Sequence, residues 1–173
     1  ASVKEEGSLV VSARLFGDIV RSLPDDMVKV KGTSCFNYCN KMNDGLDIES
    51  CNVTVEGCDF IILAGFLPKV PQYLIERFPN RIINIHPALL PKFGGKGMWG
   101  HHVHEAVKAA GETRSGITIH FVNAELDEGE HIAQFSCELS PDDTPEQIAD
   151  KVHELEMRHF PMVIEQIIKN NIQ

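Results

Sequence analysis

Apolar and polar positions divide the chain into a clearly patterned part, residues 58–168, and an N-terminal part, residues 1–57. Apolar runs bounded by Gly or Pro are typical of buried strands, whereas apolar residues three and four apart are typical of helices. The pattern predicts strands at 58–65, 81–86, 116–122 and 131–137 and helices at 71–78 and 100–110. The N-terminal part offers a strand at 9–12, a helix at 15–23 and a strand at 27–31, with no clear period over 32–57.

The last helix has its own start signal. Thr144 can cap it, Pro145 suits the first helical position, and Gln147 completes a Thr-x-x-Gln capping box. Apolar residues then recur at spacings near three and four, which predicts a stripe that packs on the sheet: Ile148, Val152, Leu155, Val163 and Ile167. Pro161 is expected to kink or interrupt this helix.

Strands that alternate with helices predict an α/β fold, with a mostly parallel central sheet and helices on both of its faces. The length of 173 residues suits a single domain spanning 1–173. Because a βαβ unit takes roughly 30 residues, residues 1–57 are too few for three such units. We therefore expect an atypical N-terminal half, 1–57, and a well-defined half, 58–168.

Charge and hydropathy narrow the classes of partner. Lys plus Arg is 16 and Asp plus Glu is 25, which gives a net charge of −9. An acidic chain is unsuited to nucleic acid or to an anionic membrane surface. The longest apolar stretch, 60–67, is far shorter than the ~20 residues of a membrane span. Residues 1–7 are polar and acidic, unlike a signal peptide, so a cytoplasmic protein without membrane or nucleic-acid partners is expected.

Cysteines and histidines could indicate a metal site. Cysteines stand at positions 35, 39, 51, 58 and 137, an odd number that favours reduced thiols. The first four are spaced irregularly and lack the C-x2-C pair common in zinc sites. His101, His102 and His104 would share a helix face only loosely, with Glu105 as the one nearby carboxylate. We therefore expect no metal.

The strand at 81–86 ends in polar residues. Side chains alternate along a strand, so Asn84 and His86 should point to the same face. In open α/β sheets ligands bind beyond the carboxyl ends of strands. An Asn amide there can donate a hydrogen bond to a developing oxyanion, and a His can move a proton near neutral pH. The alternative, which this run alone leaves equally open, is that both side chains satisfy loop backbone.

Two loops follow these strands. The acidic turn 125–129 could bring a carboxylate against His86, which would stabilise a positive charge on the ring and orient it; the alternative is a solvated turn. The loop 93–100 contains four glycines, typical of a flexible or tightly turning segment, and lacks the spacing of a P-loop. Before it, the Leu90–Pro91 bond is a candidate for the cis form.

Several motifs in order resemble those of the folate-dependent formyltransferases. They are Asn-Ile-His-Pro-Ala-Leu-Leu-Pro at 84–91, Ser-Gly-Ile-Thr-Ile-His-Phe-Val at 115–122 and Glu-Leu-Asp at 125–127. Residues 63–67 are similar to the folate-side strand and loop of that family, and residues 151–156 with 159–161 to its C-terminal helix. The resemblance runs from residue 58 to residue 168.

The resemblance implies transfer of a formyl group from 10-formyltetrahydrofolate to the amine of glycinamide ribonucleotide in purine biosynthesis, by a monomer or homodimer without metal. It implies a catalytic trio of Asn84, His86 and Asp127. Asn84 and His86 would stabilise the oxyanion, His86 would supply a proton, and Asp127 would keep His86 charged. The implied folate contacts are Leu67, Pro68, Lys69, Val70, Asn84, Asn123, Ala124, Glu125, Leu126 and Asp127. The implied nucleotide contacts are His153, Glu154, Leu155 and Glu156.

One family feature has no match in the chain. The family holds the substrate phosphate in a Gly-Ser-Gly type loop after its first strand, at a helix N-terminus, and no such loop follows residues 9–14. Another acceptor therefore stays open, in a related formyltransferase or a deformylase. A non-catalytic folate-binding homologue is a further alternative, against which the intact trio argues.

Overall fold

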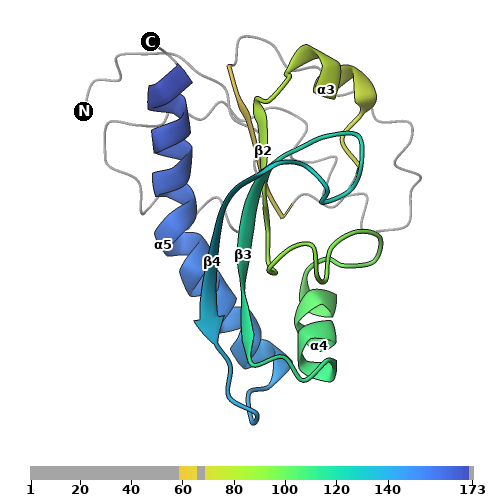
Figure 1. The fold of residues 1–173 in the computed structure, drawn as a ribbon, viewed down its shortest axis with the longest axis vertical. Coiled ribbons are helices and arrows are strands. Elements are labelled where there is room, and N and C mark those ends of the chain that lie inside the picture. Colours follow the sequence, from red (N-terminus) through yellow and green to blue (C-terminus); the bar gives the residue numbers. More distant parts are fainter. Residues whose placement is uncertain (1–58, 66–68, 172–173) are drawn as a thin grey trace, which may run out of the picture.

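The computed structural model describes residues 59–65 and 69–171 (Figure 1). Its elements in chain order are β1 (Ile61–Ala64), α3 (Gln72–Arg77), β2 (Ile82–His86), α4 (His101–Ala109), β3 (Arg114–Phe121), β4 (His131–Glu138) and α5 (Pro145–Asn171). Each element predicted after residue 58 is therefore confirmed, with bounds that differ by at most three residues. The elements expected within 1–57, and the cysteines at 35, 39, 51 and 58, lie outside the described residues.

The four described strands form one sheet in the order β1-β2-β3-β4. β1 pairs with β2 in parallel, but β2 with β3 and β3 with β4 are antiparallel, so the expected mostly parallel arrangement does not hold for these strands. His86, the last residue of β2, pairs with Thr118, and β3 begins four residues earlier at Arg114. After β2 the chain passes through α4 and re-enters the sheet at the end where β2 finished. β3 therefore runs antiparallel to β2.

Helices cover both faces of the sheet, as predicted. In the fully buried strand β1, Ile62 and Ala64 join the larger core cluster with residues of α4 and α5, whereas Ile61 and Leu63 pack with α3. Figure 1 shows α5 running along β3 and β4. Each fully buried aliphatic side chain contributes roughly 1.5–3 kcal/mol, so this alternation ties the sheet to both helical layers.

The start of α5 confirms the predicted capping box. Thr144 Oγ1 accepts the Gln147 N–H at 3.3 Å, and Gln147 Oε1 accepts the Thr144 N–H at 2.8 Å. The helix continues through Pro161 without interruption. Pro161 and its neighbour Phe160 are buried, and this packing offsets the roughly 3 kcal/mol that a proline costs inside a helix.

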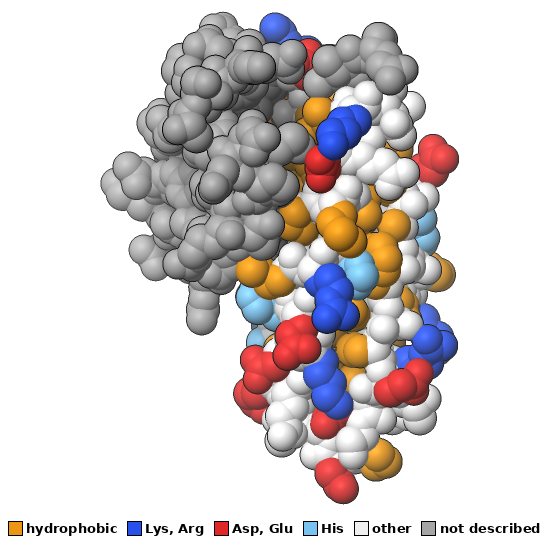
Figure 2. All heavy atoms as spheres, turned by 90° about the vertical axis from the view of Figure 1, so that its left-hand side faces the viewer, with side chains coloured by type: hydrophobic (Ala, Val, Ile, Leu, Met, Phe, Trp, Pro, Cys, Tyr) orange, Lys and Arg blue, Asp and Glu red, His pale blue; other side chains and the backbone are white. Residues whose placement is uncertain are grey.

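The outer surface of α5 is mixed in character. Figure 2 shows the α5 side of the molecule, where basic and acidic side chains are interspersed with apolar ones. Within the described residues, no helix has the combined length and apolar character that crossing a membrane requires.

Candidate active site

Asn84 and His86 lie at the carboxyl end of β2 and point to the same face of the sheet. Ile83 and Ile85, which alternate with them, point into the larger core cluster. Both polar side chains line a cavity of about 870 Å³. His86 is 4% exposed and Asn84 is partly exposed. The predicted alternation is therefore confirmed, and the two side chains border a space that can hold a ligand.

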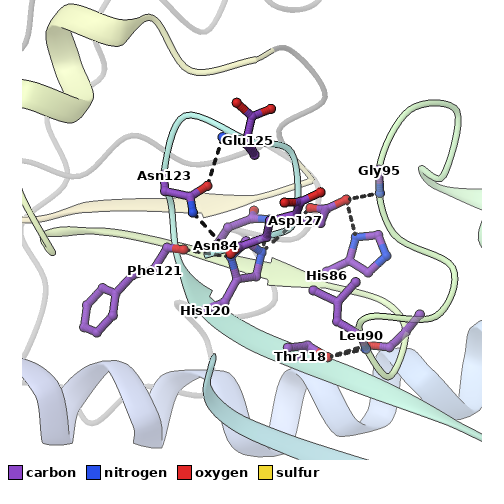
Figure 3. A network of polar contacts seen from close by, with 12 residues as sticks. Asn84, His86, Leu90, Gly95, Thr118, His120, Phe121, Asn123, Glu125 and Asp127 are labelled. Atoms are coloured by element: carbon purple, nitrogen blue, oxygen red, sulfur yellow. Dashed lines mark hydrogen bonds and ion pairs between the residues drawn. The ribbon is translucent and has the colours of Figure 1, made fainter. Parts of the chain in front are cut away.

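The two ring nitrogens of His86 have different neighbours. Nε2 lies 2.7 Å from the carbonyl oxygen of Phe93; because a carbonyl can only accept, Nε2 carries a proton and donates. Nδ1 lies 3.6 Å from Asp127 Oδ2. This is an ion-pair distance rather than a hydrogen bond, so Asp127 acts on the ring through its charge. The expected approach of an acid from the turn 125–129 to His86 is confirmed (Figure 3).

Asp127 is held by the glycine-rich loop. Its Oδ2 accepts the Gly95 N–H at 2.8 Å, and its backbone is left-handed, with φ of 58°. Loop and turn touch at Gly94, where a Cβ atom would lie 2.5 Å from Leu90 Cδ2 and 3.3 Å from Asp127 Cβ. A side chain at position 94 would displace the Leu90 side chain and press on Asp127, so glycine suits this close approach.

His120 is a site residue to which the sequence analysis assigned no role. Its Nδ1–H donates to the Phe121 carbonyl at 2.9 Å, which leaves Nε2 to accept the Asn84 Nδ2–H at 3.2 Å. Burial lowers the pKa of His120, against the opposing effects of the Phe121 hydrogen bond and the Asp127 charge. A neutral ring thus orients the Asn84 amide. The sequence did contain a signal for this role: His120 is a polar residue that follows the alternating Ile117 and Ile119 on a buried strand.

His104, which lies on α4, is one of the residues that line the cavity. It is buried, and its Nδ1 has no hydrogen-bond partner among the described residues. Burial first, and then the nearby His101 and His86, lower the pKa of His104 to about 4. His101 and His102 instead contact the Glu105 carboxylate. Within 59–65 and 69–171, no three His, Cys, Asp or Glu side chains are grouped as metal ligands.

Most of the expected folate contacts line the cavity. The expected folate contacts that line the cavity are Lys69, Val70, Asn84, Asn123, Glu125, Leu126 and Asp127. Ala124 lies within the same turn but not on the cavity lining, and Leu67 and Pro68 lie outside the described residues. Further lining residues to which the sequence analysis assigned no role include Leu63, Met98, Trp99 and Asp150.

The expected nucleotide contacts on α5 divide between two pockets. His153 and Glu156 line the cavity, with His153 Nδ1 3.2 Å from Glu156 Oε2. Glu154 and Leu155 line a separate pocket beside Cys137, which His153 also borders. Helix geometry explains the division, because residues three apart share a face whereas those between them turn away.

Comparison with known proteins places the chain in a family. The model of the formyl transferase family matches residues 42–164. The chain is 47% identical to the chloroplastic phosphoribosylglycinamide formyltransferase of Arabidopsis thaliana over 117 residues, which cover 68% of this chain and 40% of that protein. It is 38% identical to the phosphoribosylglycinamide formyltransferase of Bacillus subtilis over 113 residues, 65% of this chain and 55% of that one. The matched region thus spans about half of the length of these curated relatives, or less.

Solved structures agree with the fold. The phosphoribosylglycinamide formyltransferase of Streptococcus pneumoniae matches with a TM-score of 0.68 at 25% identity, over 95% of this chain and 99% of that one. The enzyme of the same name from Anaplasma phagocytophilum matches with a TM-score of 0.70 at 20% identity, over 95% and 86%. On the match of its sequence to the family model and of its fold to these structures, the chain belongs to the formyl transferase family.

Proposed function

We propose that this protein transfers the formyl group of 10-formyltetrahydrofolate to the primary amine of glycinamide ribonucleotide, a step of purine biosynthesis. The observation that carries the proposal is the placement of Asn84, His86 and Asp127 around one cavity, in a chain of the formyl transferase family. The choice of acceptor rests on the names of the similar proteins from Arabidopsis thaliana and Bacillus subtilis.

Asn84 and His86 would stabilise the tetrahedral intermediate. The substrate amine attacks the formyl carbon, a C–N bond forms, and the carbonyl oxygen takes up negative charge. One N–H of the Asn84 amide is held by His120, and the other is available to this oxyanion. His86, fixed through Nε2 by the Phe93 carbonyl, presents Nδ1 to the same region. Loss of one such donor typically raises the barrier by ~3–4 kcal/mol.

Proton transfer completes the proposed reaction. The intermediate collapses when the bond between the formyl carbon and the folate nitrogen breaks, and the leaving nitrogen takes a proton from the charged His86 ring. The attacking amine loses one proton, which passes directly or through water to the His86 ring that has just donated one, so the ring returns to its starting state and charge balances over the transfer. The carboxylate of Asp127, 3.6 Å from the ring and mostly buried, stabilises the imidazolium that this role requires.

The two substrates would enter from different sides of the cavity. Lys69, Val70 and the turn 123–127 form the proposed folate side. His153 and Glu156 on α5 form the proposed nucleotide side, where a carboxylate can bind ribose hydroxyl groups. Because both sets border the same cavity as the trio, the formyl carbon and the amine could meet beside Asn84 and His86.

Formyl transfer by the purified protein tests the proposal. The protein is incubated with 10-formyltetrahydrofolate and one of three acceptors: glycinamide ribonucleotide, an amino-sugar nucleotide, or water alone. We expect formylated product and folate turnover only with glycinamide ribonucleotide, and no transfer by a folded His86→Ala variant. Equal folate turnover in water would instead identify a deformylase. Folate binding without turnover under any condition would identify a non-catalytic homologue.

A further inference from the structure

A row of polar side chains crosses the sheet on the face that carries the trio. The strand registers place His86 opposite Thr118, and Thr118 opposite Gln134 on β4. Side chains directly opposite each other in neighbouring strands share a face. Gln134 therefore lies on the same face as His86, two strands away, and it is not among the described residues that line the cavity.

Thr118 and Gln134 hold the start of the loop that follows β2. The fully buried Thr118 hydroxyl donates to the Ala88 carbonyl at 2.7 Å and accepts the Leu90 N–H at 3.0 Å. The Gln134 side-chain NH2 donates to the Thr118 hydroxyl and to the Leu90 carbonyl, both at 2.9 Å. The hydroxyl thus gives one hydrogen bond and accepts two, which is its full capacity. Both backbone polar groups of Leu90 are fixed by side chains of β3 and β4.

The same loop supplies the backbone groups that orient two members of the trio. Three residues after Leu90, the Phe93 carbonyl accepts the Nε2–H of His86. Two residues further on, the Gly95 N–H donates to Asp127 Oδ2. A displacement of Leu90 would therefore move the partners of both the ring and the carboxylate.

We propose that Gln134 is a positioning residue for formyl transfer. Through Thr118 and Leu90 it sets the positions of the Phe93 carbonyl and the Gly95 N–H. These two backbone groups in turn orient His86 and Asp127. The inference rests on the proposed function for its catalytic consequence. A primary amide suits this task because its two N–H donors diverge at a fixed angle and reach a carbonyl and a hydroxyl together.

The central variant is Gln134→Met, which keeps the length of the side chain and removes both donors. Kinetic constants are measured with both proposed substrates. We expect kcat to fall about 10- to 100-fold, because small displacements of reacting groups cost rate to this extent. KM for both substrates should stay within about threefold, because Gln134 touches neither proposed binding side. Ser136→Ala is the matched control: Ser136 lies two residues along the same strand, is exposed, and contacts Arg114 outside the site.

A second readout does not depend on turnover. The ring-nitrogen NMR signals of His86 are recorded without substrates and assigned by their loss in His86→Gln. In Gln134→Met we expect the Nε2 signal to shift and its proton to exchange with water faster, because the hydrogen bond to Phe93 is disturbed; in Ser136→Ala both should match the wild type. This readout stays valid if the wild type proves to use another acceptor, so failure of the proposed function is separable from failure of this inference.

The inference is overturned if folded Gln134→Met keeps the wild-type kcat, or if its kcat falls while the His86 ring signals stay unchanged, since the residue would then have a structural role only. If Gln134→Met does not fold, Gln134→Asn replaces it. That variant keeps a polar amide but is one methylene too short to reach Leu90. The same losses in rate and the same change at the ring are expected of it, and their absence overturns the inference equally.

Discussion

The Asn84 amide and the His120 ring face each other across β2 and β3, with Asn84 Nδ2 3.2 Å from His120 Nε2. The ring can accept this hydrogen bond because its other nitrogen donates to the Phe121 carbonyl. An amide that could otherwise rotate is therefore held, and its second N–H and its oxygen have no hydrogen-bond partner among the residues that the structure describes. Asn84 depends on a residue that is 36 positions away in the sequence.

Removal of the acceptor at position 120 should cost activity. In His120→Leu the Asn84 amide loses its partner, and we expect kcat to fall by about 10- to 100-fold, because a polar group left without its partner costs ~1–3 kcal/mol. His120→Gln, whose side-chain oxygen can reach the place of Nε2, should retain most of the rate. Steady-state kinetics of both variants, beside their unfolding curves, measure the effect. Equal activity of the two variants would contradict the orienting role.

The charge of Asp127 should matter more than its shape. Asp127→Asn preserves the size of the side chain and an oxygen that can accept the Gly95 N–H, but removes the carboxylate 3.6 Å from His86. We expect kcat to fall about 100- to 1000-fold with little change in stability, because electrostatic support of the transition state is lost. Glu128→Gln, in the same turn and exposed, is the control and should leave kcat unchanged. Parallel losses in both variants would indicate a nonspecific effect of net charge.

A side chain at position 94 should disturb the contact between the loop and the turn. Gly94→Ala places a Cβ atom 2.5 Å from Leu90 Cδ2, and we expect a loss of about 1–3 kcal/mol in the free energy of unfolding. Leu90→Val removes the clashing methyl position, so the double variant should lose less stability than the sum of the two single variants. Denaturant unfolding of the three proteins provides this double-mutant cycle. Strict additivity would show that the added methyl group does not meet Leu90.

The buried His104 should make stability depend on pH. Its pKa is lowered from 6.5 to about 4 by burial and by the nearby His101 and His86. Above pH 6.5 the ring is neutral in both the folded and the unfolded protein. Between pH 6.5 and 4 the unfolded chain binds a proton that the folded protein excludes, so stability falls with pH by at most about 1.4 kcal/mol per unit. Below pH 4 both states bind it and this dependence ends.

The His104→Gln variant isolates that contribution. It cannot titrate in this range, so its free energy of unfolding should fall less than that of the wild type between pH 7 and pH 5. Urea unfolding at both pH values, for both proteins, gives the comparison. A wild type and a variant that lose the same stability would show that His104 is not the group responsible.

The elements after residue 58 follow from local rules. Alternation of polar and apolar residues placed Asn84 and His86 on one face, and the spacing of Thr144 and Gln147 marked the start of α5. The candidate Leu90–Pro91 bond is indeed cis. The direction of β3 was not accessible in the same way, because a helix between two strands has the same sequence pattern whether or not it crosses the sheet.

The sequence by itself determined the side chains of the candidate site: alternation along a strand put Asn84 and His86 on one face, and the resemblance of several motifs to those of the formyltransferases added Asp127. Only the tertiary structure decided how those side chains are held. The Phe93 carbonyl and the Gly95 N–H are backbone groups, and every residue type except proline offers both. His120 and Gln134 act through the register between strands, which is set by the packing of the whole sheet and by no local stretch of sequence.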